Sequence, residues 1–563
     1  MKNKMGRTIV LAGLCLASLL AGRSGLTAGL ENAKEKQGMK DILGYISRGW
    51  DSLTRSMTTC NEVLDPKETE VSVLYLPNGF MEPSEVKALE KNCSIRVEYL
   101  PQVISSLADV DPSKIEPPGL LFLEHPYVVP GGRFNEMYGW DSYFILRGLL
   151  REGRLDLARG IVENFFFEID HYGGVLNANR SYYLTRSQPP FLTSMILAIY
   201  DAEKVKGQDD QEWLKRAYPY AVRDYQFWTR TPHLAGDTGL SRYYDFGSGP
   251  VPEMGDSPGY YRGVARYFLR HPQEANSYLA RSIGEHPAPN SIGPHFPFEL
   301  CEPGADSMKD CTPVETVSLT QEYFKGDRSM RESGFDVSFR FGPYSAATHH
   351  YAGVDLNSLL YKAEKDLERI SLILGQKQEA SQWQARAAKR REAVTQYLWN
   401  AQRGLYFDYN FETHAQSSYV FAATFYPLWA GLASPEQASA VRRNLKLFEQ
   451  PGGLAMSQTN SGAQWDLPYG WAPVQLIAVE GLRRYGFNED ADRLSYKFLS
   501  MVLENFRREE TIREKYNVVT RSSETHVEAG YEQNVVGFGW TNAAFLELLH
   551  ALPEPWVKRL AED

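Results

Sequence analysis

The chain has 563 residues, of which 43% are hydrophobic and 23% charged, a composition typical of a globular protein with one very large domain or several smaller ones. Its formal net charge of −10 argues against nucleic acid or an anionic membrane as a partner and suits a small neutral molecule. Aromatic residues reach 13%, which favours a groove for a ligand.

The N-terminus has the pattern of an export signal. Basic residues precede the apolar run 9–21, which is too short for a stable membrane span. We therefore expect residues 1–28 to be a signal peptide and the protein to be exported, either periplasmic or secreted. A lipoprotein anchored through Cys15 is the alternative, but a clear processing box is missing. No later run of apolar residues is long enough to span a membrane, so no membrane partner is expected after signal removal.

Beyond the expected signal lie four cysteines: Cys60, Cys93, Cys301 and Cys311. An even number in an exported protein permits two disulfides. Proximity in sequence favours the pairs Cys60–Cys93 and Cys301–Cys311 among three connectivities, and four free thiols remain the alternative. No two of these cysteines have the short spacing of a zinc site.

Residues 29–119 are mixed in character and are expected to form an N-terminal extension that packs on the main domain. Residues 71–75 alternate like a short strand, and residues 94–100 indicate a second. Pro117 and Pro118 mark the end of this extension.

From about residue 140 the pattern becomes helical. One helix is predicted from Asn357 or Ser358 to Gly375, because its apolar residues recur at steps of three and four. The next helix carries Trp383 and ends near Asn400. Further helices are predicted at residues 155–167, 191–204, 211–229, 474–485, 490–506 and 541–551.

This succession of helix pairs is too long for a four-helix bundle, and it lacks the fixed period of a solenoid. A closed ring of helix pairs buries every apolar face without end caps and gathers the long loops at one end, where function usually lies. We therefore predict an all-α ring over residues 120–563. Residues 255–329, rich in Pro and Gly and poor in periodicity, are expected to be an insertion.

Polar and aromatic residues concentrate in the segments 130–144, 177–191, 332–336 and 464–473. Sugar hydroxyls need donors and acceptors, and the C–H face of a sugar ring needs an aromatic plane. Each acid taken singly is more often structural. Together, carboxylates, arginines and aromatic rings are the residue types of glycoside hydrolysis.

Other chemistries lack their sequence patterns. The chain has no H-E-x-x-H, no G-x-S-x-G and no P-loop. His349 and His350 are adjacent and on a regular element would not converge on one metal, so no metal is expected. No dinucleotide fingerprint follows a strand, so no cofactor is expected either.

The polar segments resemble, in the same order, the signatures of the α,α-trehalases of glycoside hydrolase family 37. Residues 130–143 resemble the first signature and residues 464–473 the second. Shorter matches occur at residues 177–191, 354–358, 451–454, 514–516 and 537–542. The resemblance spans about residues 120–551. It implies an (α/α)6 barrel that hydrolyses α,α-trehalose to two glucose molecules with inversion and without a cofactor.

The resemblance also implies residue roles. Asp336, in Ser-Gly-Phe-Asp, corresponds to the general acid, and Glu514, in Glu-Lys-Tyr, to the general base. A one-residue shift from the ungapped match at Tyr531 makes Glu532 the counterpart of the family's lid glutamate. Further sugar contacts are implied for Arg133, Trp140, Asp141, Asn177, Arg186, Ser187, Gln188, Glu253 and Gly334.

Three departures from the family pattern bear on specificity. Val251 stands where the family commonly has an arginine, Phe335 replaces a tryptophan, and the glycine-rich lid is absent. The insertion adjoins Glu253 and could supply a substitute arginine or a different lid. The leading prediction is an exported, monomeric trehalase. An inverting glucosidase acting on another small α-glucoside and a non-catalytic sugar-binding protein on the same barrel are the alternatives.

Overall fold

The computed structural model describes residues 37–64, 71–254, 258–275, 277–282, 293, 296–301 and 311–562. The predicted signal peptide, residues 1–28, lies outside this part of the chain. Among the described residues, no helix has both the length and the apolar character that crossing a membrane requires.

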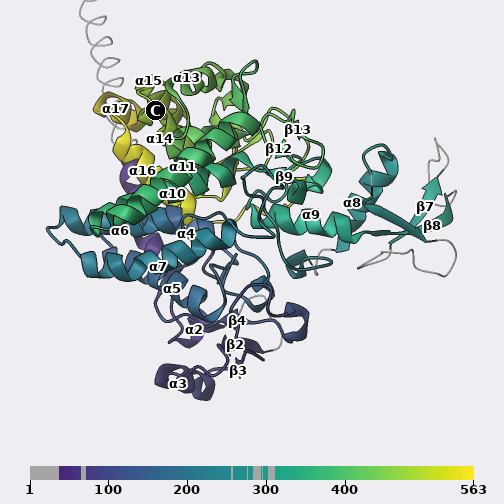
Figure 1. The fold of residues 1–563 in the computed structure, drawn as a ribbon, viewed down its shortest axis with the longest axis horizontal. Helices are drawn as coiled ribbons and strands as arrows, with labels where there is room; N and C mark the ends of the chain where they lie inside the picture. Colours follow the sequence, from purple (N-terminus) through teal and green to yellow (C-terminus); the bar gives the residue numbers. More distant parts are fainter. Residues whose placement is uncertain are drawn as a thin grey trace, which may run out of the picture.

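Six helices of the described chain form a closed inner ring (Figure 1). In order around the ring they are α4 (Gly139–Arg151), α6 (Leu192–Val205), α10 (Val354–Ile373), α12 (Tyr426–Ala430), α14 (Ala472–Arg484) and α16 (Gly539–Ala551). Each helix packs on the next, and α16 packs on α4. At this closure Gly148 is necessary, because a Cβ there would lie 2.8 Å from Trp50 and 2.9 Å from the Cβ of Ala543. The predicted (α/α)6 barrel is confirmed.

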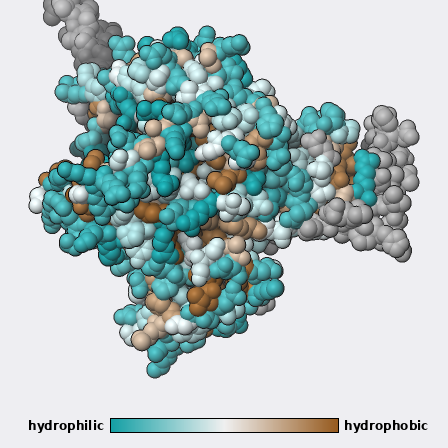
Figure 2. Space-filling view, in the orientation of Figure 1, coloured by the Kyte–Doolittle hydropathy of each residue, from teal (hydrophilic) through white to brown (hydrophobic). Residues whose placement is uncertain are grey.

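A second layer of helices surrounds the ring. It consists of residues 37–53, α5 (Leu155–His171), α7 (Gln211–Trp228), α11 (Lys377–Tyr397), α13 (Pro435–Arg443) and α15 (Asn488–Glu509), and α17 (Glu554–Glu562) packs on α15. In α15 the buried Leu494, Phe498 and Met501 recur at steps of three and four, so one face packs inward. Figure 2 shows the resulting surface as mostly hydrophilic with scattered apolar residues.

Most predicted helices agree with the structure to within a few residues. The largest shift at a helix start is in α10, which begins at Val354 and not at Asn357 or Ser358. Asn357 does not cap this helix, because its side chain accepts a hydrogen bond from the backbone N of Ser241 at 2.8 Å. The cap position is Gly353.

The helices α4, α8 (Pro258–Arg270), α9 (Gln321–Glu332), α12 and α13 were not predicted. Ten of the thirteen residues of α4 are buried, so the helix has no polar face, and its apolar residues show no helical period in the sequence. α9 has the opposite composition, because its buried face includes Asp327, Arg328, Arg331 and Glu332. It begins inside the segment predicted as an insertion.

The N-terminal extension contains a three-stranded parallel sheet of order β3-β2-β4 below the ring in Figure 1. Its elements are β2 (Ser72–Leu76), α3 (Ser84–Asn92), β3 (Ile95–Tyr99) and β4 (Leu120–Leu121), which confirms both predicted strands. A disulfide between Cys60, in α2 (Cys60–Val63), and Cys93 confirms the first predicted pair. The extension contacts the ring's loops where the backbone N of Ser181 donates to the carbonyl of Gly119 at 2.9 Å.

A lobe projects from the ring between α7 and α10 (Figure 1). It holds α8 and an antiparallel sheet of order β6-β8-β7, with β6 (Leu279–Ser282), β7 (Phe296–Cys301) and β8 (Cys311–Leu319). Tyr261, Val264 and Phe268 of α8 form a separate small core with Val317 and Leu319. The backbones at 301 and 311 are paired in register, but these cysteine side chains lie outside the description, so the second disulfide stays a prediction.

The loops contain short paired strands and single-turn helices, which hold them in place. Strands pair as β1 (Thr54–Arg55) with β5 (Tyr127–Val128), β10 (Trp399–Asn400) with β11 (Leu405–Tyr406), β12 (Tyr409–Asn410) with β9 (Tyr351–Ala352) and β13 (Ala415–Gln416), β14 (Glu449–Gln450) with β15 (Gly453–Leu454), and β16 (Tyr469–Trp471) with β17 (Lys515–Asn517). The single turns are η1 (Pro112–Lys114), η2 (Ser181–Tyr183), η3 (Pro252–Met254), η5 (Pro343–Ser345), η6 (Thr348–His350), η7 (Ala422–Phe425) and η8 (Leu445–Leu447). The β16–β17 pair joins the second signature to the Glu-Lys-Tyr segment.

Candidate active site

Buried aromatic side chains fill the centre of the ring: Trp140, Phe335, Trp465, Trp471 and Trp540. The ring centroid of Trp140 lies 5.4 Å from that of Phe335 and 5.8 Å from that of Trp465, and Trp465 stacks on Trp471 at 3.9 Å. Phe335 thus occupies the aromatic cluster although the family commonly has a tryptophan there. Phe335, Trp140 and Trp465 are immediately followed in sequence by acids.

Gly334 lets the chain approach this aromatic floor. Its φ is +76°, a conformation that side chains other than glycine rarely adopt, and a Cβ would lie 2.8 Å from the indole of Trp140. The predicted site residue Gly334 therefore acts through its backbone, by placing Phe335 and Asp336 against Trp140.

Three carboxyl groups from distant segments converge above the floor. Asp141 is 4% exposed, and burial raises its pKa well above the ordinary value, with further contributions from the negative charges of Glu514 and Asp336. Only groups that lie close to Asp141 can act on it in this way. The structure therefore brings Asp336 and Glu514 to the same part of the ring.

Gln464 fixes the backbone around both predicted catalytic acids. Its amide nitrogen donates to the carbonyl oxygen of Asp336, and its amide oxygen accepts from Nζ of Lys515 at 3.0 Å. Trp540 Nε1 donates to the carbonyl oxygen of Glu514 at 3.3 Å. One side chain of the second signature thus links the segments that carry the two acids.

The two acids differ in their electrostatic surroundings. Burial raises the pKa of Asp336 to about 7, against the opposing charges of Arg331 and Arg186. Burial also raises the pKa of Glu514, but the Lys515 ammonium, 3.5 Å from its Oε2, opposes that rise through its charge and a hydrogen bond. Asp336 can therefore hold a proton near neutral pH.

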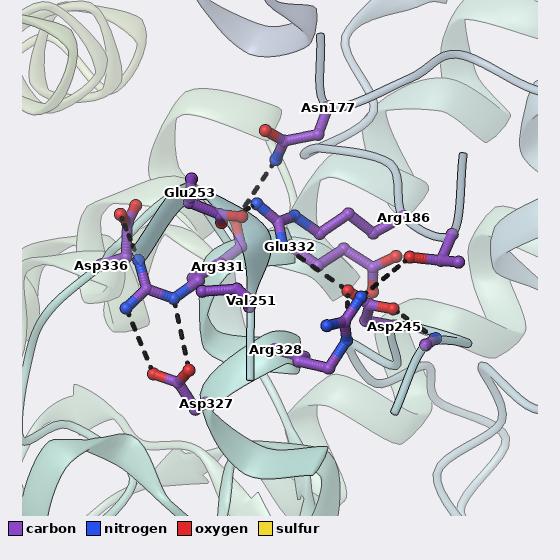
Figure 3. A network of polar contacts seen from close by, with 12 residues as sticks. Asn177, Arg186, Asp245, Val251, Glu253, Asp327, Arg328, Arg331, Glu332 and Asp336 are labelled. Atoms are coloured by element: carbon purple, nitrogen blue, oxygen red, sulfur yellow. Dashed lines mark hydrogen bonds and ion pairs between the residues drawn. The ribbon is translucent and has the colours of Figure 1, made fainter. Parts of the chain in front are cut away.

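Arg331, at the end of α9, lies between Asp336 and Asp327 on one side of the polar network in Figure 3. Its guanidinium is 3.3 Å from Oδ1 of Asp327 and 3.6 Å from Oδ2 of Asp336, and it donates to the hydroxyl of Tyr531 at 3.1 Å. The side chain is only 1% exposed. Asp327 neutralises this cation from one side, while the other side faces Asp336.

Arg186 and Glu253 form a buried ion pair beside Arg331 (Figure 3). Burial alone would raise the pKa of Glu253, but the charges of Arg186 and Arg331 outweigh burial and lower it. Arg186 also lies 3.6 Å from Oδ2 of Asp245, and its guanidinium sits over the ring of Tyr183. Both members of the pair were predicted site residues, and the structure brings them together.

Arg328 holds the far side of this network. Its Nε is 3.2 Å from Oδ2 of Asp245, and its Nη2 donates to Oγ1 of Thr185 at 3.1 Å. Burial would raise the pKa of Asp245, but Arg328 and Arg186 together lower it. Asp245 is thus an ionised bridge between two arginines.

Asn177, Ser187 and Gln188 mainly hold backbone in place. The Asn177 amide nitrogen lies 3.4 Å from the carbonyl oxygens of Ser187 and Arg331. The amide oxygen of Gln188 accepts from the backbone N of Trp140 at 3.0 Å, in the first turn of α4. These predicted binding residues lie in the site, where they support the acids and arginines.

Arg133 lies at the rim. It is exposed, and its guanidinium is 5.7 Å from the ring centroid of Tyr531. Its charge lowers the pKa of Glu514, behind burial and Lys515 in size, so it lies within electrostatic reach of that acid. Arg133, for which a sugar contact was predicted, thus has an exposed side chain at the rim of the site.

The structure places Glu532, the predicted lid residue, at the surface. Glu532 is exposed and lines a surface hollow with Arg508, Glu509 and Arg513, whereas the neighbouring Tyr531 contacts Arg331. Adjacent side chains on an extended segment point to opposite sides, so only one of the two can face the site. The ungapped match at Tyr531, and not the shifted one, gives the residue that faces inward.

Five residues of this network were missed from the sequence: Asp245, Asp327, Arg328, Arg331 and Tyr531. Arg331 was missed because it lies one position before the polar segment 332–336, and no matched signature includes it. Tyr531 was passed over because a one-residue shift of the match restores a glutamate at Glu532. The signal for Arg331 was the missing arginine at Val251: Val251 is buried, and Figure 3 shows it in the same network as Arg331.

Comparison with known proteins agrees with this geometry. A family model described as Trehalase matches residues 30–288 and 316–553. A cytosolic neutral trehalase from Saccharomyces cerevisiae is 38% identical over 88% of this chain and 69% of its own length, and a probable trehalase from Eremothecium gossypii is 37% identical over 88% and 70%. The solved structure of neutral trehalase Nth1 from Saccharomyces cerevisiae has a TM-score of 0.73 and 33% identity, covering 93% of this chain and 96% of that one.

The prediction of an exported protein is wrong by the same comparison. Similar proteins from Saccharomyces cerevisiae, Neurospora crassa and Kluyveromyces lactis are named cytosolic neutral trehalases. A basic and apolar N-terminus is a compositional pattern only, and the residues that carry it lie outside the described structure.

Proposed function

The chain belongs to the trehalase family of glycoside hydrolases, and from that premise we propose that Asp336 and Glu514 are the acid and base with which it hydrolyses α,α-trehalose to two glucose molecules. The observation that carries the assignment is that the Gln464 side chain bonds both the backbone of Asp336 and the side chain of Lys515, next to Glu514, while both acids act electrostatically on Asp141. Asp336 lies between α9 and α10 and Glu514 just before β17, so only the closed ring brings them together.

In this mechanism Asp336 is protonated and donates its proton to the glycosidic oxygen as the bond from that oxygen to the anomeric carbon breaks. Glu514 is ionised and takes a proton from a water molecule, whose oxygen bonds to the opposite face of that carbon. The pKa of about 7 suits Asp336 to the first role, and Lys515 favours the charged form of Glu514 for the second.

Substrate binding is assigned to the arginine network. Trehalose is neutral, so a site with unpaired charges would lose hydration energy without return. Arg186 is paired with Glu253, and Arg331 with Asp327, which leaves directed donors and acceptors with little net charge. The Trp140 and Phe335 rings supply apolar faces for the C–H surface of the sugar.

Arg331 takes the place of the arginine that the family commonly has at the position of Val251. It reaches Asp336 and acts electrostatically on Glu253, the acid two residues after Val251. The substitute therefore comes from the segment that follows the lobe. Since all of these residues belong to one chain, we propose that the protein acts as a monomer.

The test is glucose release from trehalose by Asp336→Asn and Glu514→Gln. Each should lose at least about 10²-fold in kcat while folding normally, given the size of acid–base contributions. The wild-type reaction followed by NMR should release α- and β-glucose initially in equal amounts, the signature of inversion. Near-normal turnover in either variant removes that residue from the proposed pair.

Two alternatives predict different results. An inverting glucosidase for another small α-glucoside would act on other members of a disaccharide panel and leave trehalose intact. A sugar-binding protein would bind trehalose tightly and release no glucose. The converging acids and the raised pKa of Asp336 favour catalysis.

A further inference from the structure

A cluster of possible metal ligands lies at the other end of α9 from the active site. Glu322 is in the first turn of α9, and His349 and His350 are in η6, which packs on α9. Oε1 of Glu322 is 3.0 Å from Nε2 of His349 and 2.7 Å from Nε2 of His350. The three ligand atoms all lie within 4.8 Å of one another.

We propose that Glu322, His349 and His350 form a binding site for a divalent first-row transition ion, for which Zn²⁺ is the probe.

The convergence of two adjacent histidines depends on local geometry. On a regular strand the two side chains would point to opposite sides. Here the chain leaves η6 into an extended conformation at Tyr351, and the two imidazole rings lie side by side with centroids 3.9 Å apart. Both rings then direct Nε2 at the same oxygen of Glu322, contrary to the expectation from their spacing.

The ligand set selects the class of ion. Two imidazoles and one carboxylate are typical ligands of Zn²⁺ and neighbouring transition ions, whereas Ca²⁺ and Mg²⁺ take mostly oxygen ligands. In a tetrahedral Zn²⁺ site with bonds of about 2.0–2.1 Å, ligand atoms lie about 3.3 Å apart. The two nitrogen–oxygen distances, 3.0 and 2.7 Å, are shorter than that spacing, so the ligand atoms have to move apart by about half an ångström or less to admit the ion. The fourth position would take water.

The histidines can present their Nε2 lone pairs to an ion. The Nδ1 atoms of both rings are buried and have no hydrogen-bond partner among the described residues. In the ion-free cluster each Nε2 donates its proton to Oε1 of Glu322, and that proton can move to Nδ1 when Nε2 binds a metal. A purely hydrogen-bonded cluster would not need two imidazoles on one carboxylate oxygen.

The cluster is accessible but held in place. The side chain of Glu322 is 38% exposed and that of His350 27%, which opens a path for the ion, whereas that of His349 is 5% exposed. Arg242 donates to the carbonyl oxygen of His349 at 2.8 Å and so fixes the backbone of η6. Its positive charge lies near His349 and opposes the ion, so binding should be weaker than in a site without that cation.

The position of the cluster links it to catalysis without contact to the sugar. Glu322 precedes and His349 follows the segment 333–348, which carries Asp336. An ion bound by all three residues would tie the first turn of α9 to η6 and so bracket residues 323–348, which include Asp336. We expect slower amide hydrogen exchange in residues 333–348 when Zn²⁺ is bound.

The test uses the full chain, freed of metal by a chelator and titrated with Zn²⁺ by calorimetry. The wild type should bind one ion saturably, and Co²⁺ in its place should give a d–d absorption spectrum. The His349→Ala/His350→Ala variant should bind at least about 10–100-fold more weakly, a range that even outer-shell substitutions reach. Mg²⁺ should not bind.

Two further variants make the result decisive. His550→Gln changes an exposed histidine at the end of α16 and should leave Zn²⁺ binding unchanged. Glu322→Gln keeps a hydrogen-bond acceptor at the cluster but removes the negative charge of the carboxylate, so it should weaken Zn²⁺ binding. Zn²⁺ should raise the Tm of the wild type and leave the Tm of this variant unchanged. Absence of saturable binding in the wild type, or equal binding in the double histidine variant, overturns the proposal.

Discussion

Replacing Arg331 by glutamine should move the alkaline limb of the pH profile of kcat/KM to higher pH. Asp336 must be protonated to act as the general acid, so activity should fall as pH rises through its pKa of about 7. The positive charge of Arg331 favours the ionised carboxylate and thereby lowers that pKa. Without this charge, Asp336 should keep its proton to higher pH.

The distance between the two groups sets the size of the effect. Nη1 of Arg331 is 3.6 Å from Oδ2 of Asp336. At an effective dielectric constant of about 20, two unit charges at that distance interact by about 4.6 kcal/mol. The side chain of Asp336 is 23% exposed, and Glu253 also faces the guanidinium, so we take about a third of this value. About 1.5 kcal/mol moves the limb by about one pH unit.

The assay is the initial rate of glucose release at trehalose concentrations well below KM, from acid to alkaline pH. Arg331→Lys keeps the charge and should keep the limb near its original position. Asp327→Asn/Arg331→Gln removes the buried partner as well, which avoids the cost of an unpaired carboxylate. If the limb does not move in either glutamine variant while both fold, the charge of Arg331 does not govern Asp336.

Three other substitutions test separate parts of the structure. Tyr531→Phe removes the hydroxyl that Arg331 contacts at 3.1 Å and should lower kcat/KM about tenfold. Tenfold corresponds to the lower end of the free energy that a hydrogen bond to a charged group contributes. Unchanged kinetics would exclude Tyr531 from the site. Val251→Arg adds a cation at a position 1% exposed and should cost about 3–5 kcal/mol in urea unfolding, with recovery when Arg331→Gln is added; equal losses in both would show that the two sites are independent. Cys60→Ala/Cys93→Ala should lower the free energy of unfolding by about 2–4 kcal/mol, and a reductant should do the same to the wild type but not to the variant.

Amphipathic helices were the most predictable part of the fold. α15 and the second half of α10 pack one face inward, so their apolar residues recur with a helical period. α4 and α9 were missed for opposite reasons, because α4 is buried on nearly all sides and α9 buries charged residues. Both unpredicted helices supply residues of the site, and the burial of polar groups there is what removes the periodic signal.

The site was predictable where its residues are contiguous with a signature. Asp336 and Glu514 were found because each lies in a short motif, but Arg331 replaces a side chain that is 80 positions away in sequence at Val251. A residue that takes another residue's place in space, from a distant part of the sequence, leaves no motif at its own position. The choice between Tyr531 and Glu532 depended likewise on a loop held by Gly530, where a Cβ would lie 2.9 Å from the side chain of Gln464.

The packing of α16 on α4 has a consequence for synthesis of the protein. The inner helices follow one another around the ring in sequence order, but the contact that closes the ring joins segments about 400 residues apart. Until Gly539–Ala551 has left the ribosome, α4 lacks the helix that packs on its flank at Gly148, where Ala543 lies in the finished ring. A truncation that removes only α16 should therefore leave an aggregation-prone product and not a shorter working enzyme.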